Sequence, residues 1–463
     1  MIPSDRWQRR RRDRLAEDYT QHSLSRRDVL QRTLTLGLSI SAAGSWLTAC
    51  ANNGSRTASS TVVDVLTTWS GEEKDSFEIM LSPFTQQSGI QVNVMSTRDL
   101  NNTLTDYIRE GTLPDIAILP NPAKMTELAN QGILIPLDSF LDMQQIHQDY
   151  AQRWVDLGTF KGKLYALFVK GANKSTIWYS PTQLKNSQIP TTWQGLITLS
   201  NTIARSGKYP WSVGVSSGTA SGWPAADWIA ELYLNESGPI LYSQWVKHSI
   251  PWTHASIQSA FQKFGQIVHG PHYIKDAPQS ILTTSPAQAS NAPFQSSPDA
   301  YMCYLGDFAE GFITHAFPSL KVGHDINFFP FPSINSKYKG GVTVGADLVV
   351  AMQKNSAAGE LVRYLATAQA QEVWVRRGGF VSLNQSVEQE AYPNDVAKSN
   401  AEGLMMAEAT NILLFGAGDL MPPRVQQAFW ENLLTYIEDA SQLDSVLQRI
   451  EYIAEQEYLS WPG

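Results

Sequence analysis

The fold of this chain is decided by the stretch VVDVLTTW at residues 62–69 and by two strand-like runs that follow it, IQVNVM at 90–95 and PDIAIL at 114–119. Residues 72–88 and 100–110 lie between these runs, and each segment has the composition and length of a helix. The order strand, helix, strand, helix, strand is typical of a parallel sheet covered by helices. The sequence therefore predicts an α/β fold.

The N-terminus has the three parts of a bacterial export signal. Arg26 and Arg27 form a twin-arginine motif after a basic region, an apolar stretch follows at 34–49, and the run LTAC ends at Cys50. Because the apolar stretch is too short to span a bilayer, we interpret residues 1–49 as a lipoprotein signal peptide that is removed before a lipidated Cys50. Residues 50–61 then form a flexible tether. We expect a protein that the export machinery delivers to the outer face of the cell membrane, where a lipid anchor holds it.

The length of the chain predicts two lobes. About 400 of its 463 residues follow the signal peptide, which is more than one hydrophobic core usually holds. Residues 165–179 are extended and are interrupted by GANK at 171–174, which favours a crossing between lobes; residues 332–341 and 376–382 have the composition of two more crossings. Further strands are expected at 211–215, 300–304, 327–331 and 342–352. The expected lobes are 62–172 with 338–380, and 173–337 with 381–463.

Charge and cysteine content exclude several classes of protein. The chain carries a net charge of −8, and residues 1–49 hold nine Arg and five acidic residues, so the exported part carries about −12. Such an acidic protein does not suit a nucleic acid as a partner. Beyond Cys50 the only cysteine is Cys303, in an apolar run that reads as a buried strand, so we expect an inert thiol and no disulfide framework. We expect no metal and no cofactor.

Five different short blocks of sequence follow one another along residues 62–450. The first is GTLPDI at 111–116, followed by LANQGILIPLD at 128–138. The others are DWI at 227–229 with GP at 238–239 and IPW at 250–252, GHDINFFPFP at 323–332, YLAT at 364–367 with RGGF at 377–380, and DLMPP at 419–423 with FW at 429–430. With these blocks the chain resembles the bacterial extracellular solute-binding proteins of carbohydrate ABC transporters, and it is most similar to their α-glucoside branch, distant relatives of maltose-binding protein.

The resemblance implies a two-lobe periplasmic-binding-protein fold of type II, with a ligand cleft between lobes joined by three crossings. It also implies that the lobes close on a carbohydrate ligand and deliver it to the permease subunits of an ABC transporter in the membrane. A protein of this kind is a binding protein and not an enzyme.

Candidate ligand-binding residues are those that suit a sugar and that follow strands or lie on crossings. Aromatic rings pack against the C–H faces of a sugar, and Asp, Asn and Arg bind its hydroxyl groups. In a parallel sheet ligands bind beyond the carboxyl ends of the strands, which points to the loops after residues 69 and 120. The candidates are Trp69, Asn121, Asn173, Trp178, Trp223, Asp227, Asp307, Asp347, Arg377 and Asp419.

Several candidates have a competing structural role. Asn173 could close a turn, Arg377 could form a salt bridge, and Asp419 could cap the helix that follows it. Trp223 is the strongest candidate for stacking on a sugar, because a comparable Trp-Pro helix start carries a stacking aromatic in relatives of maltose-binding protein. Asp227 lies four residues further along the same helix face.

Other functions are favoured less by the sequence. The run GVSSG at 214–218 has the pattern of a serine hydrolase nucleophile elbow, but residues 219–224 separate it from the next helix, whereas an elbow needs the helix at once. A glycoside hydrolase would need two carboxylates at a set separation. A lipoprotein of the same fold that binds a peptide or a metal remains the main alternative, since fold does not determine the ligand.

We predict a monomer, because delivery to a transporter requires an exposed cleft. Size-exclusion chromatography with light scattering should give the mass of one chain. A stable dimer with an occluded cleft would contradict this prediction.

Overall fold

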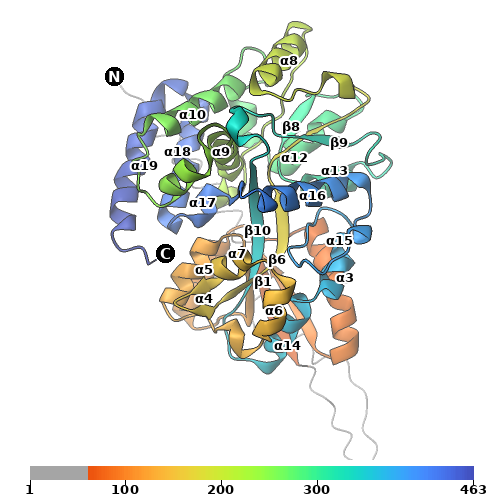
Figure 1. Ribbon diagram of the computed structural model, residues 1–463, viewed down its shortest axis with the longest axis vertical. Helices are drawn as coiled ribbons and strands as arrows, with labels where there is room; N and C mark the ends of the chain where they lie inside the picture. Colours follow the sequence, from red (N-terminus) through yellow and green to blue (C-terminus); the bar gives the residue numbers. More distant parts are fainter. Residues whose placement is uncertain (1–60, 463) are drawn as a thin grey trace, which may run out of the picture. The chain divides into compact units, whose positions relative to one another are not determined.

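The predicted parallel sheet is present in the computed structural model, which describes residues 61–462 (Figure 1). Strands β1 (Val62–Thr67), β2 (Gln91–Ser96) and β3 (Ile116–Leu119) are parallel, with β1 between the other two. Helices α3 (Glu72–Ser88) and α4 (Leu100–Glu110) connect them. The strand-helix alternation at the start of the described chain is therefore confirmed, and the carboxyl ends of the three strands lie at one edge of the sheet.

Two long strands extend this sheet and lead out of it. Strand β6 (Ala166–Asn173) pairs antiparallel with β10 (Val342–Ala351), and β10 also pairs antiparallel with β3 and parallel with β11 (Leu413–Phe415). The sheet contains six strands, in the order β11-β10-β3-β1-β2 with β6 on β10. Figure 1 shows β6 and β10 side by side in the middle of the view.

A second, smaller sheet follows β6 almost at once. Strand β7 (Thr176–Tyr179) lies between β8 (Met302–Tyr304) and β9 (Asn327–Pro330), and both pairings are antiparallel. The chain therefore passes from one sheet to the other at residues 174–175. The strand expected at 211–215 is reduced to an isolated bridge between Trp211 and Met302.

The described residues have two large hydrophobic cores and one small one. The first core surrounds the six-stranded sheet, and we call the elements packed on it the first half. The second core lies among α9 (Trp223–Val246), α10 (Ala255–Val268), α18 (Pro423–Glu438) and α19 (Leu443–Tyr458), and the small third core contains Trp178 and Cys303. We call the elements packed on these two cores the second half. Burial of each large side chain contributes about 1.5–3 kcal/mol to stability, so each half has its own core to hold it together.

One segment packs differently from the predicted division of the chain. Residues 381–463 were expected in the second lobe, but α16 (Asp395–Ala409) buries Ala397, Ala401 and Leu404 in the first core. Two of these residues are alanines spaced one helical turn apart, and they allow α16 to lie close to β6 and β10. The chain returns to the second half only after β11, near residue 416. The third crossing between the halves is therefore not at residues 376–382. Val381 in that segment instead forms a β-bridge with Gly171 of β6.

The remaining helices and short strands cover these cores. They are α5 (Pro122–Asn130), α6 (Met143–Asp149), α7 (Gln152–Leu157), β4 (Thr159–Phe160), β5 (Lys163–Leu164), α8 (Trp193–Arg205), α11 (Gln279–Thr283), α12 (Pro286–Asn291), α13 (Ala309–Ala316), α14 (Ser356–Leu365), α15 (Ala368–Val375) and α17 (Ala417–Leu420). Within residues 61–462 no helix combines the length and the apolar character that crossing a bilayer requires. The predicted signal peptide with Arg26 and Arg27, the predicted lipidation site Cys50 and the tether up to residue 60 lie outside the described residues.

Glycine is required where α9 begins. Gly222 precedes the first residue of α9 and has a φ of 103°, which side chains rarely allow. A Cβ atom built on it would lie 2.4 Å from the backbone oxygen of Trp430 on α18. The absence of a side chain therefore lets the start of α9 pack directly on the α18 backbone.

Replacement of Gly222 by alanine should destabilise the protein. We expect Gly222→Ala to lower the free energy of unfolding by about 2–4 kcal/mol, because it adds both backbone strain and a clash. Urea denaturation measures this change. Gly311→Ala on α13 is the matched control, since nothing lies within 4 Å of the added Cβ; equal effects of the two variants would refute this account of Gly222.

Candidate ligand-binding cleft

A pocket lies where the carboxyl ends of β1 and β3 meet residues of the second half. It encloses a cavity of about 200 Å³. Thr68 and Trp69 follow β1, and Pro120 and Asn121 follow β3. The second half contributes residues at the start of α9 and around α13, α17 and α18. The site therefore lies beyond the carboxyl ends of parallel strands, as the fold predicts.

Aromatic rings form part of the pocket wall in both halves. Trp69 is only 2% exposed, and its Nε1 donates a hydrogen bond to Asp347 Oδ2 at 3.0 Å. Its ring makes edge contacts with Phe77 and Trp374, whose centroids lie 5.0 and 4.9 Å away. Such contacts hold the indole in one orientation. From the second half, Trp223, Phe308, Phe312 and Trp430 line the pocket.

The first charged group of the pocket surrounds Lys170 of β6. Its Nζ lies 2.5 Å from Glu73 Oε1, and the strand register places Lys170 opposite Asp347 of β10. Burial lowers the pKa of Lys170, but the charges of Glu73 and Asp347 outweigh burial and the net shift is upward. Burial raises the pKa of Asp347 to about 6, and the positive charge of Lys170 opposes that shift. Lys170 therefore stays protonated at neutral pH.

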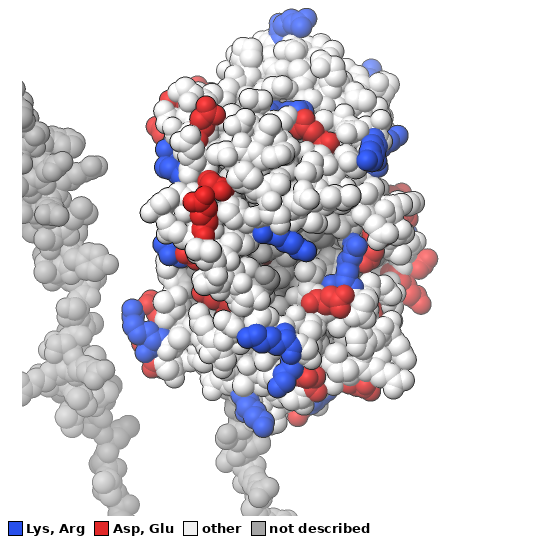
Figure 2. Space-filling model, turned by 60° about the vertical axis from the view of Figure 1, so that its left-hand side comes forward, with Lys and Arg blue, Asp and Glu red and all other residues white. Residues whose placement is uncertain are grey.

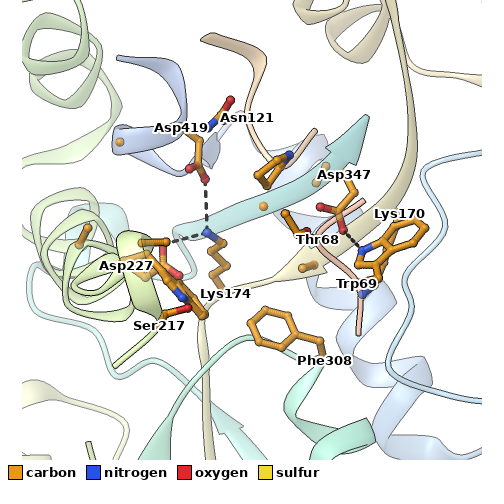
Figure 3. Close-up of a pocket in the computed structure, with 18 of the residues that line it drawn as sticks. Thr68, Trp69, Asn121, Lys170, Lys174, Ser217, Asp227, Phe308, Asp347 and Asp419 are labelled. Atoms are coloured by element: carbon orange, nitrogen blue, oxygen red, sulfur yellow. Dashed lines mark hydrogen bonds and ion pairs between the residues drawn. The ribbon is translucent and has the colours of Figure 1, made fainter. Parts of the chain in front are cut away.

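The second charged group surrounds Lys174, in the short segment that joins the two sheets. Lys174 Nζ lies 2.8 Å from Asp227 Oδ1 of α9 and 3.4 Å from Asp419 Oδ2 of α17 (Figure 3). Burial raises the pKa of Asp227 to about 6, while Lys174 lowers it and Asp419 raises it. One ammonium group is therefore shared by two carboxylates, and all three face the cavity.

Six of the ten residues predicted from sequence line this pocket. The structure brings together Trp69, Asn121, Trp223, Asp227, Asp347 and Asp419. Trp223 is the first residue of α9 and lies 6.1 Å from the ring of Phe308, while Lys174 Nζ lies 5.8 Å from the Trp223 ring. The competing role of Asp419 as a helix cap is not what the structure shows, because its carboxylate instead faces Lys174 and Gln426.

Asn173 and Asp307 lie beside the pocket and bond to each other. The backbone N–H of Asn173 donates to Asp307 Oδ2 at 3.0 Å, and Asn173 Oδ1 accepts from the backbone N–H of Ser175. Asn173 therefore closes a turn, which was its competing role. Asp307 is 3% exposed and its Oδ1 has no hydrogen-bond partner among residues 61–462, so burial raises its pKa to about 7.

Trp178 and Arg377 also lie outside the pocket. Trp178 is fully buried, and its Nε1 donates to the backbone oxygen of Leu305 at 3.1 Å. Strand β7 turns this side chain toward the small core instead of the cleft, because successive side chains on a strand alternate between its two faces. Arg377 Nε donates to Ser76 Oγ on α3 at 3.0 Å. Among the described residues Arg377 therefore neither lines the pocket, as predicted, nor forms the salt bridge that was its competing role.

Sequence reasoning missed two lysines and several aromatic residues of the pocket. Lys170 and Lys174 are four residues apart along an extended segment, so their side chains point to the same side. That spacing is a usable signal for paired cations at a crossing. Phe308 follows the candidate Asp307 directly, and the strand end that suggested Asp307 also places Phe308 at the pocket. Ser217 lies in the GVSSG run and Trp430 in the FW pair of the last block, but neither pattern by itself indicated a sugar contact, and Arg98 had no distinguishing local pattern.

A family model described as bacterial extracellular solute-binding protein matches residues 70–372. The chain belongs to this family. It is 31% identical over 389 residues to the alpha-glucosides-binding periplasmic protein AglE of Rhizobium meliloti, a match that covers 81% of this chain and 83% of the relative. It is 29% identical over 405 residues to the osmoprotective compounds-binding protein GgtB of Synechocystis sp., a match that covers 86% of this chain and 92% of GgtB. The predicted family is confirmed, and the chain is an extracellular solute-binding protein.

Solved structures of the same fold are similar to this solute-binding protein over most of its length. The solute receptor AcbH matches with a TM-score of 0.74 and 19% identity, covering 86% of this chain and all of the receptor. A chitin oligosaccharide binding protein matches with a TM-score of 0.73 and 16% identity, covering 87% and 100%. Maltose-bound MalE3 of T. maritima matches with a TM-score of 0.68 and 15% identity, covering 86% of this chain and 99% of MalE3. The predicted two-lobe periplasmic-binding-protein fold is confirmed.

Asp307 should make the solute-binding protein less stable as pH rises from about 4 to about 7. Its pKa is about 7 in the folded protein against an ordinary value of 3.8, so the folded state binds more protons than the unfolded state in this window and stability falls as pH rises. Asp307→Asn removes this ionisation. We compare the free energy of unfolding of this variant with that of the wild type by urea denaturation. The difference, variant minus wild type, should be larger at pH 8 than at pH 5 by about 1 kcal/mol or more.

The control for this measurement is Asp325→Asn. The pKa of Asp325 is lowered by a hydrogen bond from the backbone N–H of Lys321, so it titrates below the pH range of the test. Its substitution should have the same effect on stability at pH 5 and at pH 8. If Asp307→Asn behaves in the same way as Asp325→Asn, the assignment of a raised pKa to Asp307 is wrong.

Proposed function

We propose that this solute-binding protein captures a sugar, an α-glucoside or a related oligosaccharide, and delivers it to the permease of an ABC transporter. The observation that carries the proposal is the composition of the pocket wall. Aromatic rings of both halves stand beside ion-paired carboxylate and ammonium groups, and a sugar needs both kinds of surface. AglE, whose name states that it binds alpha-glucosides, is similar over four fifths of the chain and supports the ligand class.

The charges of the pocket favour an uncharged ligand. Four acidic residues and three basic ones line it, namely Glu73, Asp227, Asp347 and Asp419 with Arg98, Lys170 and Lys174. Both lysines already have carboxylate partners at 2.5–3.4 Å, and Arg98 donates to Ser70 Oγ at 2.9 Å. An anionic ligand could therefore pair only with Arg98 and would lie close to four carboxylates. Hydroxyl groups fit better, because each can donate to a carboxylate oxygen and accept from an ammonium group. The space-filling view in Figure 2 likewise shows basic and acidic side chains interspersed around a hollow on one face of the molecule.

The remaining parts of the proposal come from the N-terminal sequence and from the family. Removal of residues 1–49 and lipidation of Cys50 would anchor the protein at the outer face of the membrane, beside the permease that receives its ligand. A tether up to residue 61 would leave the cleft free to reach that permease. We expect the protein to act as a monomer and to bind its sugar without cleaving it.

A thermal-shift screen tests the ligand class. Maltose, longer maltooligosaccharides, trehalose, sucrose, peptides and divalent metals would be compared, and a ligand at 100 times its Kd should add about 2.7 kcal/mol of stability. Trp223→Ala should weaken binding of the best sugar by about 10-fold or more, because it removes a ring that can stack on the ligand. Trp461→Ala, a similar truncation near the C-terminus, should leave binding unchanged.

Two results of this screen would contradict the proposal. Stabilisation by a peptide or a metal without any sugar would leave the fold unchanged and overturn the ligand class. Turnover of a chromogenic glycoside would identify a hydrolase, which is the other function that the sequence leaves open.

A further inference from the structure

Three polar contacts between described side chains join the two halves across the cleft, and a fourth, from Asn394 Nδ2 to Glu310 Oε1 at 2.9 Å, joins them where α16 packs on the connecting strands. Two of them lie at the surface. His315, whose side chain is 70% exposed, is 3.4 Å from Glu72, and Thr219 donates to Asp99 at 3.0 Å at an exposed position. Water competes for such contacts, so each contributes little to holding the halves together.

The third contact across the cleft is buried. Asn121 Nδ2 donates to Gln426 Oε1 at 3.1 Å, and the two residues are 4% and 2% exposed. Asn121 lies at the carboxyl end of β3 in the first half, whereas Gln426 lies on α18 in the second half. Gln426 does not line the pocket. It can therefore affect a ligand only through its neighbours.

The orientation of both amide groups is determined by their other partners. Asn121 Oδ1 caps α5 by accepting from the backbone N–H of Lys124 at 3.2 Å, so its NH₂ group is the part left to face the second half. Gln426 must then present its oxygen to Asn121. Its own NH₂ group donates to Asp419 Oδ1 at 3.0 Å. The helix cap in one half and the Asp419 carboxylate in the other thus require the same orientation of the Gln426 amide.

The same chain of contacts continues into the second charged group of the pocket. The other oxygen of Asp419 lies 3.4 Å from Lys174 Nζ, and Lys174 in turn pairs with Asp227. Figure 3 shows Asn121 and Asp419 next to each other, with the dashed contacts leading on to Lys174 and Asp227. Asp419 is therefore held on one side by Lys174 and on the other by an amide whose orientation depends on the first half.

We propose that Gln426 is a positioning residue that links closure of the two halves to the placement of the Asp419 carboxylate toward the ligand. This inference rests on the proposed function, because Asp419 is taken there to bind a sugar hydroxyl group. When the halves separate, the bond from Asn121 is lost and the Gln426 amide is held only by its bond to Asp419. When they close, the amide is held from both sides, and the Asp419 carboxylate that accepts from it presents its remaining lone pairs to the cavity in one arrangement.

The chemistry of this contact suits a reversible closure. It is a hydrogen bond between neutral amides, so salt does not screen it, and both amides can bond to water when the halves are apart. This hydrogen bond therefore makes a modest, orientation-dependent contribution to the free energy of closure. A ligand that bonds to Asp419 would favour the arrangement in which Asn121 and Gln426 are in contact, and would shift the population toward closure.

Three variants test the proposal. Gln426→Leu removes both of its hydrogen bonds, and Asn121→Ser removes the donor to Gln426 but keeps a residue that caps helices well. The third variant combines them. Gln427→Leu is the matched control, because it makes the same change on the next residue of α18. It loses only contacts within the second half, to Glu431 and to the backbone oxygen of Thr219, and the Thr219 hydroxyl that donates to Asp99 stays in place.

The first measurement needs no sugar. Spin labels at Thr105→Cys on α4 and Gln244→Cys on α9, two exposed positions, would report the distance between the halves; Cys303 is buried, and a Cys50→Ser background prevents other labelling. We expect Gln426→Leu and Asn121→Ser to broaden the distance distribution toward longer distances, and Gln427→Leu to leave it as in the parent. Identical distributions in all of these proteins would overturn the proposal.

The second measurement uses the sugar that gives the largest thermal shift. Gln426→Leu should raise its Kd by about 3- to 10-fold through faster dissociation, the effect expected for one neutral hydrogen bond. The double variant should raise the Kd by no more than the more damaging single substitution does, because the two residues act through one contact. Additive losses of binding free energy in the double variant would refute the proposal. If no sugar binds but the label distances change as expected, closure still depends on Gln426 and only the proposed ligand class fails.

Discussion

The antiparallel pairing of β6 with β10 is the constraint on which the rest of the structure depends. These strands belong to the six-stranded sheet of the first half, and both lead directly to the second half. Their register places Lys170 opposite Asp347 and continues to the pair of Val344 and Asn173, beyond which the chain crosses. The same ladder of hydrogen bonds therefore joins the two halves and assembles the floor of the pocket.

A buried carboxylate holds the two strands together where they leave the sheet. Glu231 of α9 accepts hydrogen bonds from Ser175 Oγ at 2.6 Å, from Thr343 Oγ1 at 2.5 Å and from the Thr343 backbone N–H at 3.1 Å. Burial raises its pKa to about 7, and these donors oppose that shift. A carboxylate with this many donors is costly to bury but strongly directional. Glu231 thereby fixes α9, and with it Asp227 and Trp223, relative to both connecting strands.

The local parts of the fold and site could be predicted from sequence because they depend on neighbouring residues. The alternation of strands and helices in residues 62–119 reflects local periodicity, and Trp69 and Asn121 were found because both follow such strands. The third crossing was misplaced because RRGGFVS at 376–382 has the composition of a linker. The packing of α16 against β10 and β6 depends on contacts between distant segments, and β6 lies more than 200 positions before α16. The lysines were missed for a related reason, since their partners Glu73, Asp227 and Asp419 lie far from them in sequence.

The sequence by itself determined the family, the α/β class and six of the residues that line the cleft, because these follow from local patterns and from blocks whose order is preserved along the chain. Only the tertiary structure decided which candidates face the cavity. Asp307 follows Gly306 after β8, and Asp347 lies two residues after Gly345 in β10, yet Asp347 bonds to Trp69 in the pocket while Asp307 bonds to Asn173 behind it. The difference arises from strand register and helix packing, which position atoms that the sequence separates by hundreds of residues.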